Sequence, residues 1–257
     1  MSLVHVFILS IIEGITEFLP ISSTGHLILA SKLLGIMESD FTKTFEIAIQ
    51  LGAIMAVVFL YFKKFTQSFT LYKKLFVAFI PTAIVGFFFY PFIKGFLLSS
   101  SVVTLNALFW GGIVLILVEL LLKRKTDRSL PADGQITYKQ SFLIGVFQSI
   151  SVVPGVSRAA ATIIGGLLTG LNRETATEFS FLLAVPTMIA ASALDIYKSR
   201  QILMSGDLFL LLIGTFLSFV FAMLAVKFLI GYVKKHNFIP FGVYRIILAL
   251  VFWLLVK

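Results

Sequence analysis

Cysteine is absent from the 257 residues, and charged residues are scarce. The lack of cysteine excludes a disulfide framework and a thiol nucleophile. Charged residues make up 13% of the chain, whereas a soluble domain carries about 25%. Hydrophobic residues make up 59%, and the mean hydropathy is +1.03. The composition therefore excludes an ordinary soluble domain and indicates a polytopic membrane protein.

The N-terminus lacks the basic region of a cleavable signal sequence, and its apolar run is interrupted by Glu13 and Glu17. We therefore expect these residues to belong to the mature protein. The net charge of +9 raises the possibility of nucleic acid as a partner. However, the basic residues fall in short loops between apolar runs, as membrane topology requires, so we predict no nucleic-acid partner.

Long apolar runs dominate the rest of the chain, and about 20 such residues suffice to cross a bilayer. Six stretches qualify, at roughly 45–62, 75–92, 102–122, 177–197, 207–227 and 240–256. Two further apolar regions, 2–37 and 138–171, are broken near the middle by proline, glycine and hydroxyl residues. Such breaks are tolerated at membrane depth only inside protein or beside a wet cavity. The polar stretch 123–139 is interpreted as a solvated linker.

The linker separates two halves that match at a constant offset of 134 residues. The matched pairs are Pro20 with Pro154, Ser23 with Ser157, Phe45 with Phe179, and Leu51 with Val185. Each half then holds one broken segment and three spans, and an odd number of crossings inverts the second half. The predicted fold is one all-α integral membrane domain, residues 1–257, made of two inverted-topology repeats. Each repeat has one re-entrant broken helix pair and three transmembrane helices; repeat one covers about 1–125 and repeat two about 135–257.

Basic residues are distributed unequally between the two faces that this topology predicts. The linker face receives Lys63, Lys64, Lys73, Lys74, Lys123, Arg124, Lys125, Arg128, Lys139, Arg173, Lys234 and Lys235. The opposite face receives Lys32, Lys43, Lys94, Lys198, Arg200 and Lys257. Because cytoplasmic loops carry the excess of Lys and Arg, we predict a cytoplasmic linker and termini that face outward.

The first break contains most of the chemistry and reads E-G-I-T-E-F-L-P-I-S-S-T-G-H over residues 13–26. Ionisable groups within membrane segments are costly and indicate function by default. Glu13 and Glu17 are four residues apart, on one face of a helix that Pro20 is predicted to end. Residues 22–25 are predicted to form a polar turn, and a second helix is predicted to open at His26.

The second break reads V-V-P-G-V-S-R-A-A-A-T over residues 152–162. Pro154 and Gly155 predict a turn, and Ser157 is a good N-cap for the following helix. Arg158 then lies in the first turn, where free N–H groups and the helix dipole favour an anion. Its guanidinium suits two-point contact with phosphate, and its buried charge needs an anionic partner. That partner is Glu17 or Glu13, a phosphate, or both in turn.

Together the two breaks supply the groups for phosphoryl transfer. Glu13 and Glu17 can hold a hard divalent cation, Mg²⁺ or Ca²⁺, or act as an acid–base couple. His26 is a candidate proton carrier, and Ser22, Ser23 and Thr24 offer hydroxyls for phosphate binding or attack.

Structural roles are the alternative for each of these residues. The two glutamates could simply pair with Arg158, His26 could cap a helix, and the hydroxyls could satisfy backbone groups. Four other ionisable residues lie in or beside the spans: Glu46, Glu178, Asp195 and Arg245. Of these, Glu46 and Glu178 could line the same cavity or form structural pairs. Five glycines are expected to permit close helix packing: Gly14, Gly52, Gly165, Gly166 and Gly170.

Residues 13–26 and the P-G-V-S-R-x-x-x-T motif at 154–162 resemble the two signature regions of the undecaprenyl-diphosphate phosphatase family, of the bacitracin-resistance type. The similarity covers nearly the whole chain, including T-F-E-I-A-I-Q-L-G-A-I at 44–54 and F-G-V-Y-R at 241–245. It implies hydrolysis of a C55 polyprenyl diphosphate to the monophosphate in the bacterial plasma membrane. It also implies a divalent cation and a site that opens toward the outer face.

The resemblance assigns the site residues. Glu13 and Glu17 match the acidic, metal-binding motif, and the catalytic candidates are Glu17, Ser23, His26 and Arg158. The substrate-binding candidates are Ser22, Thr24, Gly25, Gly155, Ser157 and Thr162. One departure is that Ala159 and Ala160 stand where the family usually has serine and glycine. Because both changes raise helix propensity, Ser157 and Arg158 are taken as the working pair.

The predicted function is therefore a membrane phosphatase that acts on a polyprenyl diphosphate. Ser23 activated by His26 is the preferred nucleophile, and direct attack by His26 or a metal-bound water are the alternatives. The rival function is a transporter or lipid flippase, because facing broken helices in inverted repeats are typical of alternating access. The sequence predicts no oligomeric state.

Overall fold

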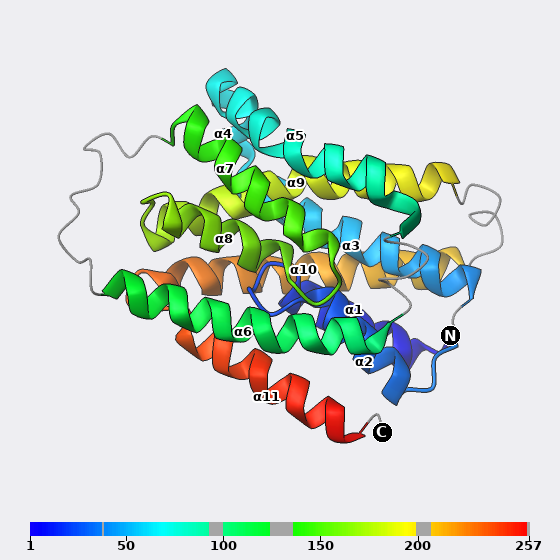
Figure 1. The fold of residues 1–257 in the computed structure, drawn as a ribbon. Coiled ribbons are helices and arrows are strands. Elements are labelled where there is room, and N and C mark those ends of the chain that lie inside the picture. The colour runs from blue at the N-terminus through cyan, green and yellow to red at the C-terminus, as the bar shows by residue number, and fades with distance from the viewer. Residues whose placement is uncertain (38, 93–99, 124–135, 199–206, 256–257) are drawn as a thin grey trace.

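The computed structural model describes residues 1–37, 39–92, 100–123, 136–198 and 207–255. Within these ranges the regular secondary structure is helical (Figure 1). The first half contains α1 (Leu3–Thr16), α2 (Ser23–Leu33), α3 (Asp40–Leu60), α4 (Phe62–Gln67), α5 (Phe69–Phe92) and α6 (Ser101–Lys123). The second half contains α7 (Tyr138–Ser149), η2 (Ile150–Val152), α8 (Arg158–Leu168), α9 (Arg173–Lys198), α10 (Leu208–Val233) and α11 (Ile239–Leu255). Most of the predicted linker, 124–135, lies outside the described residues.

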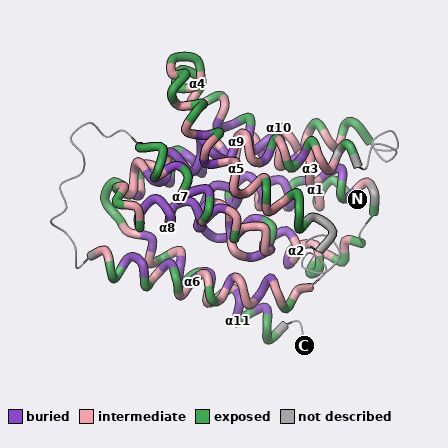
Figure 2. The backbone as a smooth tube through the Cα atoms, turned by 45° about the horizontal axis from the view of Figure 1, so that its top comes forward, coloured by how far each residue is buried: buried purple, intermediate pink, exposed green. Residues whose placement is uncertain are grey.

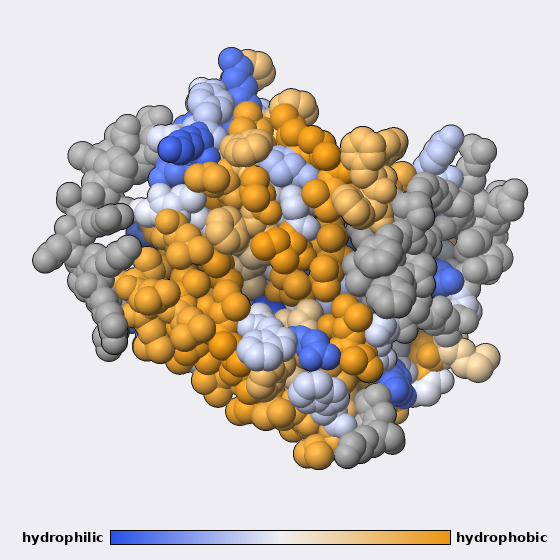
Figure 3. All heavy atoms as spheres, in the orientation of Figure 1, coloured by the Kyte–Doolittle hydropathy of each residue, from blue (hydrophilic) through white to orange (hydrophobic). Residues whose placement is uncertain are grey.

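Each of the six predicted spans forms a helix, and five of them (α3, α5, α6, α9 and α10) are long and apolar enough to cross a membrane. The sixth, α11, has 17 residues, the lower limit for a span. Large apolar side chains face outward along these helices, as with Phe59, Phe87 and Phe216, which are 67%, 75% and 64% exposed. Hydrophobic residues cover most of the face in Figure 3. These features confirm an all-α membrane protein.

The helices pack so that each broken segment lies against a long helix of the other half. Helix α1 packs on α10, and α7 packs on α5, while α6 packs on α11. The buried residues concentrate in the middle of the molecule (Figure 2). There Phe18, from the first break, meets Phe181 of α9 edge to face, with ring centroids 5.5 Å apart. The two halves therefore share one core.

The first break differs from the prediction at both of its ends. Helix α1 ends at Thr16, before Pro20, and Glu17 is its C-cap, whose N–H still bonds the Glu13 carbonyl at 2.9 Å. The next helix opens at Ser23 and not at His26, because the Ser22 hydroxyl caps it. Residues 23–25 are thus the first turn of α2 and not a loop.

Ser22 and Ser157 are structurally equivalent N-caps. Their φ values are 72° and 74°, and among the described residues they alone, besides glycines, have positive φ. The Ser22 hydroxyl accepts from the Gly25 N–H at 3.3 Å, and the Ser157 hydroxyl accepts from the Ala160 N–H at 3.2 Å. The predicted pairing of Ser23 with Ser157 is therefore wrong by one residue. By this match Ser23 corresponds to Arg158, and the offset at the two caps is 135 residues.

The C-terminal ends of α2 and α8 match at the same offset. Gly35 and Gly170 both have positive φ, 63° and 94°. Each is followed by the same backbone bond, from Ile36 N to Ser31 O at 2.9 Å and from Leu171 N to Gly166 O at 3.0 Å. Gly170 thus ends a helix in the left-handed conformation. Its predicted role in packing is wrong, because an added Cβ would meet nothing within 4 Å.

The other four glycines that were expected to pack closely do so. A Cβ on Gly14 would lie 2.6 Å from the Ser218 carbonyl, and one on Gly52 would lie 2.3 Å from the Thr215 carbonyl. Gly165 and Gly166 similarly face Phe147 and Ala176, at 2.9 and 2.8 Å. These glycines let neighbouring helices approach closely, because an added Cβ at any of them would collide with the neighbour.

The broken segments reach the middle of the molecule from opposite ends. In Figure 1, α1 and α2 extend from their break to the right-hand end, where both termini lie. Helices α7 and α8 extend to the left-hand end, and Figure 2 shows the same arrangement from another side. The two breaks therefore meet near the centre.

Candidate active site

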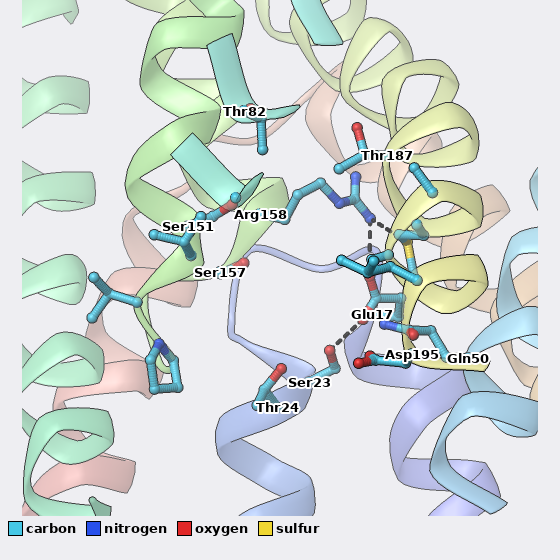
Figure 4. A pocket seen from close by; sticks show the side chains of 18 of the residues that line it. Glu17, Ser23, Thr24, Gln50, Thr82, Ser151, Ser157, Arg158, Thr187 and Asp195 are labelled. Carbon is cyan, nitrogen blue, oxygen red and sulfur yellow. Dashed lines mark hydrogen bonds and ion pairs between the residues drawn. The ribbon is translucent and has the colours of Figure 1, made fainter. Parts of the chain in front are cut away.

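A cavity of about 490 Å³ lies where the two breaks meet (Figure 4). Seven of the predicted site residues line it: Glu17, Ser22, Ser23, Thr24, Gly155, Ser157 and Arg158. The rest of the lining comes from η2 and the following residues of the second break, Ser151 to Pro154, and from α3, α5 and α9. The structure thus brings the acidic and the cationic break together in one pocket.

Glu17 links the first residues of the two helices that open at the breaks. Its Oε1 accepts from Arg158 Nη2 at 3.1 Å, and its Oε2 accepts from the Ser23 hydroxyl (Figure 4). The side chains of Arg158 and Glu17 are only 10% and 7% exposed. Removing either partner would leave a buried charge without compensation.

Arg158 is fixed by further contacts, yet one of its three side-chain nitrogens has no partner among the described residues. Its Nη1 donates to the Ser180 carbonyl at 2.9 Å, and its guanidinium lies over the Phe18 ring, 5.5 Å from the centroid. Its Nε is buried and has no hydrogen-bond partner among the described residues. A phosphate oxygen would satisfy this donor.

Two helix N-termini contribute to the electrostatics of the cavity. Ser22 and Ser23 open α2, Ser157 and Arg158 open α8, and all four line the pocket. The first N–H groups of a helix have no intrahelical partner and carry partial positive charge. Their convergence with Arg158 creates a site that favours a phosphate group.

Glu13 lies one helical turn before Glu17 and does not line the cavity. It is 2% exposed, interacts with Glu17, and its Oε2 has no hydrogen-bond partner among the described residues. A buried carboxylate oxygen without a donor fits a cation ligand. However, the described residues contain no cluster of three His, Cys, Asp or Glu side chains suited to a metal. Two carboxylates are too few to hold a cation by themselves, so any ion bound here would need further oxygen ligands from substrate or water, as is usual for Mg²⁺.

The predicted pairing of His26 with Ser23 is absent from the described contacts. Nδ1 of His26 contacts the Ser22 carbonyl at 2.7 Å, and Nε2 contacts the Tyr244 hydroxyl at 2.8 Å. The His26 and Tyr244 rings are also stacked, with centroids 5.6 Å apart. His26 does not line the cavity, so the group that contacts the Ser23 hydroxyl is Glu17.

Thr162 and Gly25 were expected to bind substrate, and neither lines the cavity. The buried Thr162 hydroxyl donates to the Ser180 hydroxyl at 2.7 Å, and the carbonyl of the same serine accepts from Arg158. Gly25 packs on Leu108, whose Cδ1 would lie 3.2 Å from an added Cβ. Their positions indicate support of the pocket and not contact with the ligand.

The turn before α8 requires glycine at position 155. Its φ is 93°, and an added Cβ would lie 2.3 Å from the Thr104 carbonyl. Both features exclude other residues without backbone movement. Ala159 and Ala160 are 0% and 2% exposed inside α8, which agrees with their predicted place in the helix.

The remaining carboxylates separate into different environments. Glu178 pairs with Lys64 at 2.7 Å and lines a second cavity, of about 450 Å³, which also contains Lys74. The hypothesis that Glu178 shares the first cavity is wrong, and Glu46 lines neither cavity. Asp195 does line the first cavity.

Sequence reasoning missed a polar wall of the cavity formed by Gln50, Thr82 and Thr187. The fully buried Gln148 organises part of it, because its Nε2 donates to the hydroxyls of Thr82 and Thr187 at 2.9 and 3.1 Å. These residues stand singly in apolar spans and form no motif. Only their polarity within a membrane segment could have indicated them.

The sequence matches the family described as bacitracin resistance protein BacA over residues 6–251. A protein of Persephonella marina named undecaprenyl-diphosphatase is 54% identical over 256 residues, covering 100% of both chains. Proteins of the same name from Aquifex aeolicus and Campylobacter jejuni are each 48% identical; they cover 95% and 98% of this chain and 95% and 93% of their own lengths. By its sequence, and with the two signature breaks meeting in one cavity, the chain belongs to the bacitracin resistance protein BacA family.

Proposed function

We propose that the chain hydrolyses undecaprenyl diphosphate to undecaprenyl phosphate and inorganic phosphate in the plasma membrane of a bacterium. This reaction would recycle the lipid carrier of cell-wall synthesis and confer bacitracin resistance. The observation that supports it best is the convergence of Glu17, Ser23 and Arg158 in one cavity, in a chain whose relatives bear that enzyme name.

The cavity has a polar end for the diphosphate and an apolar side for the lipid. At the polar end, Arg158 and the N-termini of α2 and α8 would bind phosphate oxygens, with Thr24 and Ser157 nearby. The apolar side is formed by residues of α5 and α9: Phe79, Ala83, Phe87, Ala191 and Leu194. This division suits an amphipathic substrate.

In the proposed chemistry, the Ser23 hydroxyl attacks the terminal phosphorus. A bond forms between Ser23 Oγ and phosphorus, and the bond from phosphorus to the bridging oxygen breaks, which releases undecaprenyl phosphate. Glu17 accepts the serine proton because it is already the acceptor of that hydroxyl. Water then hydrolyses the phosphoserine, and phosphate leaves. Direct attack by His26 or by water is the alternative, and His26 otherwise orients the first turn of α2 through Ser22.

The direct test measures release of inorganic phosphate by the purified protein in detergent, where no gradient exists. We expect the natural chain to release phosphate and Ser23→Ala to lose about 10²-fold or more of kcat. Ser10→Ala is the matched control, because the Ser10 hydroxyl is buried within α1 and, among the described residues, bonds the Val6 carbonyl alone, at 2.7 Å. Near-normal turnover by Ser23→Ala would exclude the serine as nucleophile, and absence of phosphate release by the natural chain would refute the hydrolase.

Glu13 and Glu17 are proposed to hold a divalent cation, Mg²⁺ or Ca²⁺, which would neutralise phosphate charge when bound. We expect Glu13→Gln to raise the Mg²⁺ concentration for half-maximal activity about tenfold or more, because one carboxylate ligand is lost. Protection from thermal unfolding by Mg²⁺ provides a second readout in the absence of substrate. Unchanged activation and protection in Glu13→Gln would remove this residue from the metal site.

We also propose that the halves are inverted repeats whose broken segments re-enter the membrane from opposite faces. The common N-caps at Ser22 and Ser157, and the reciprocal packing of α1 on α10 and α7 on α5, support this. The cavity includes Asp195 and Leu194 near the end of α9, at the end of the molecule where the termini lie. With a cytoplasmic linker, the site would therefore open to the outer face.

A transporter or flippase is the second candidate, and the facing broken helices favour it. The two functions differ in what they need. A flippase moves labelled undecaprenyl phosphate between vesicle leaflets without releasing phosphate from the diphosphate. If Glu17→Ala abolishes phosphate release but leaves lipid movement unchanged, both functions coexist in this chain.

A further inference from the structure

Arg245 of α11 is fully buried and lies outside the cavity lining. The hydrogen bonds from its guanidinium go to five backbone carbonyls, with distances of 2.8 to 3.3 Å: those of Gly155, Val156, Ala107, Leu108 and Pro20. Within the described part of the chain no carboxylate pairs with this cation, which is unusual because buried charges normally pair with one.

The donors and acceptors of this cluster balance. Arginine has five N–H donors in a rigid fork. Nε donates to Leu108, Nη1 donates to Pro20 and Val156, and Nη2 donates to Ala107 and Gly155. A lysine in the same place would keep the charge but offer three donors, so at least two carbonyls would lose their partner.

Three of these carbonyls belong to the breaks, and both breaks are represented. Pro20 lies two residues before the α2 cap Ser22, and Gly155 and Val156 directly precede the α8 cap Ser157. Carbonyls of a broken segment accept no hydrogen bond from a following helical turn. At membrane depth they therefore need another donor. One side chain supplies that donor to both breaks, and its other two bonds fix it to α6.

Helix α6 is shaped to admit this guanidinium. An added Cβ on Gly111 would lie 2.1 Å from Arg245 Nη2, and one on Gly112 would lie 3.2 Å from Arg245 Cβ. The close crossing of α6 and α11 therefore depends on glycine where the arginine passes. Gly111→Ala would displace the guanidinium without changing Arg245 itself.

We infer that Arg245 is a positioning residue that holds the two breaks as one unit, so that Ser23 and Arg158 face the same phosphate. The expected effect on catalysis rests on the proposed function. The expected effect on the stability of the two breaks rests on geometry alone. The preceding residue, Tyr244, contacts His26. Helix α11 therefore contacts the first break through two consecutive residues, Tyr244 and Arg245.

The structural test compares Arg245→Lys and Gly111→Ala with Gly231→Ala, a helical glycine around which an added Cβ would meet nothing within 4 Å. Hydrogen exchange is measured by mass spectrometry in detergent. We expect peptides from both breaks, roughly 17–26 and 152–160, to exchange about tenfold or more faster in the first two variants. In these two variants, peptides from α10 should exchange at the rate of the natural chain. In the Gly231→Ala control, the peptides from both breaks should do so as well. Faster exchange in one break only, in the whole chain, or in neither would overturn the inference.

The kinetic test asks whether Arg245 acts through Ser23. We expect Arg245→Lys to lower kcat about 10²-fold with a smaller change in KM, because small displacements of reacting groups have effects of that size. In the Ser23→Ala background the same change should have little further effect. A variant that merely lowers the folded fraction would reduce kcat by the same factor in both backgrounds. That result would overturn the positioning role, whereas a natural chain without phosphatase activity would refute the proposed function and leave the exchange result interpretable.

Discussion

Ser22 and Ser157 adopt a backbone conformation that is costly for any residue with a Cβ. The left-handed region costs such residues roughly 1–2 kcal/mol. Their hydroxyls offset part of this cost by capping α2 and α8. The same conformation turns the N-termini of both helices into the cavity, so the strain coincides with the site where a phosphate would bind.

We therefore predict different effects for two substitutions of Ser157. Ser157→Ala keeps the positive φ and loses the cap, which should lower the free energy of unfolding by about 1 kcal/mol. Ser157→Gly also loses the cap but relieves the backbone, so stability should stay within about 0.5 kcal/mol of the natural chain. Thermal unfolding in detergent measures both. The equivalent pair at Ser22 is the internal control, and an alanine variant as stable as the glycine variant would contradict this account.

At the scale of helices, each broken segment packs against a long helix of the other half through a glycine that permits close contact. A Cβ on Gly145 of α7 would lie 2.0 Å from the Ala78 carbonyl of α5. Gly14 has the corresponding role between α1 and α10, where the obstacle is the Ser218 carbonyl. Because both obstacles are backbone atoms, rotation of a side chain cannot relieve them.

Gly145→Ala should consequently destabilise the protein by about 1–3 kcal/mol, the usual range for overpacking. The control is Gly231→Ala in α10, which meets no neighbour and should be neutral or slightly stabilising, because alanine favours helix. Melting temperatures of the two variants in the same detergent provide the comparison. Equal melting temperatures would show that α5 and α7 can separate without penalty.

The helices and the breaks could be predicted from the sequence because they depend on local features. Apolar length located the spans, and Pro20 and Pro154 indicated the interruptions. The register of the repeat could not be predicted, since the second break has one more residue between its proline and its cap. Likewise, the partners of His26 and Arg245 depend on the packing of α11 against residues far away in sequence. No spacing rule encodes contacts over that range.

At the scale of the whole molecule, the two cavities lie in chemically different surroundings. The first is lined by two acidic residues, Glu17 and Asp195, and by one basic residue, Arg158. The second is lined by two basic residues, Lys64 and Lys74, by one acidic residue, Glu178, and by Ile136 near the end of the predicted linker. The hydrophilic residues that gather at the upper left in Figure 3 lie over this basic end. The difference agrees with the predicted orientation.

Orientation can be tested by labelling, because a chain without cysteine carries only the cysteine that is introduced. Met37→Cys and Gln67→Cys place exposed thiols near opposite ends of the molecule. In intact cells, or spheroplasts where an outer membrane is present, we expect a membrane-impermeant maleimide to label the first variant. The second should be labelled only after lysis. The reverse pattern would invert the topology and direct the first cavity toward the cytoplasm.

Glu17 touches the first residue of both inward-facing helices, and this arrangement has a consequence for turnover. Any phosphate that binds Nη2 of Arg158 must displace the carboxylate that already accepts from that nitrogen. Free inorganic phosphate, which has no lipid tail to retain it, would compete poorly against that resident anion. Product inhibition by phosphate should therefore be weak, and the same displacement would release Glu17 to take the serine proton when the lipid substrate arrives.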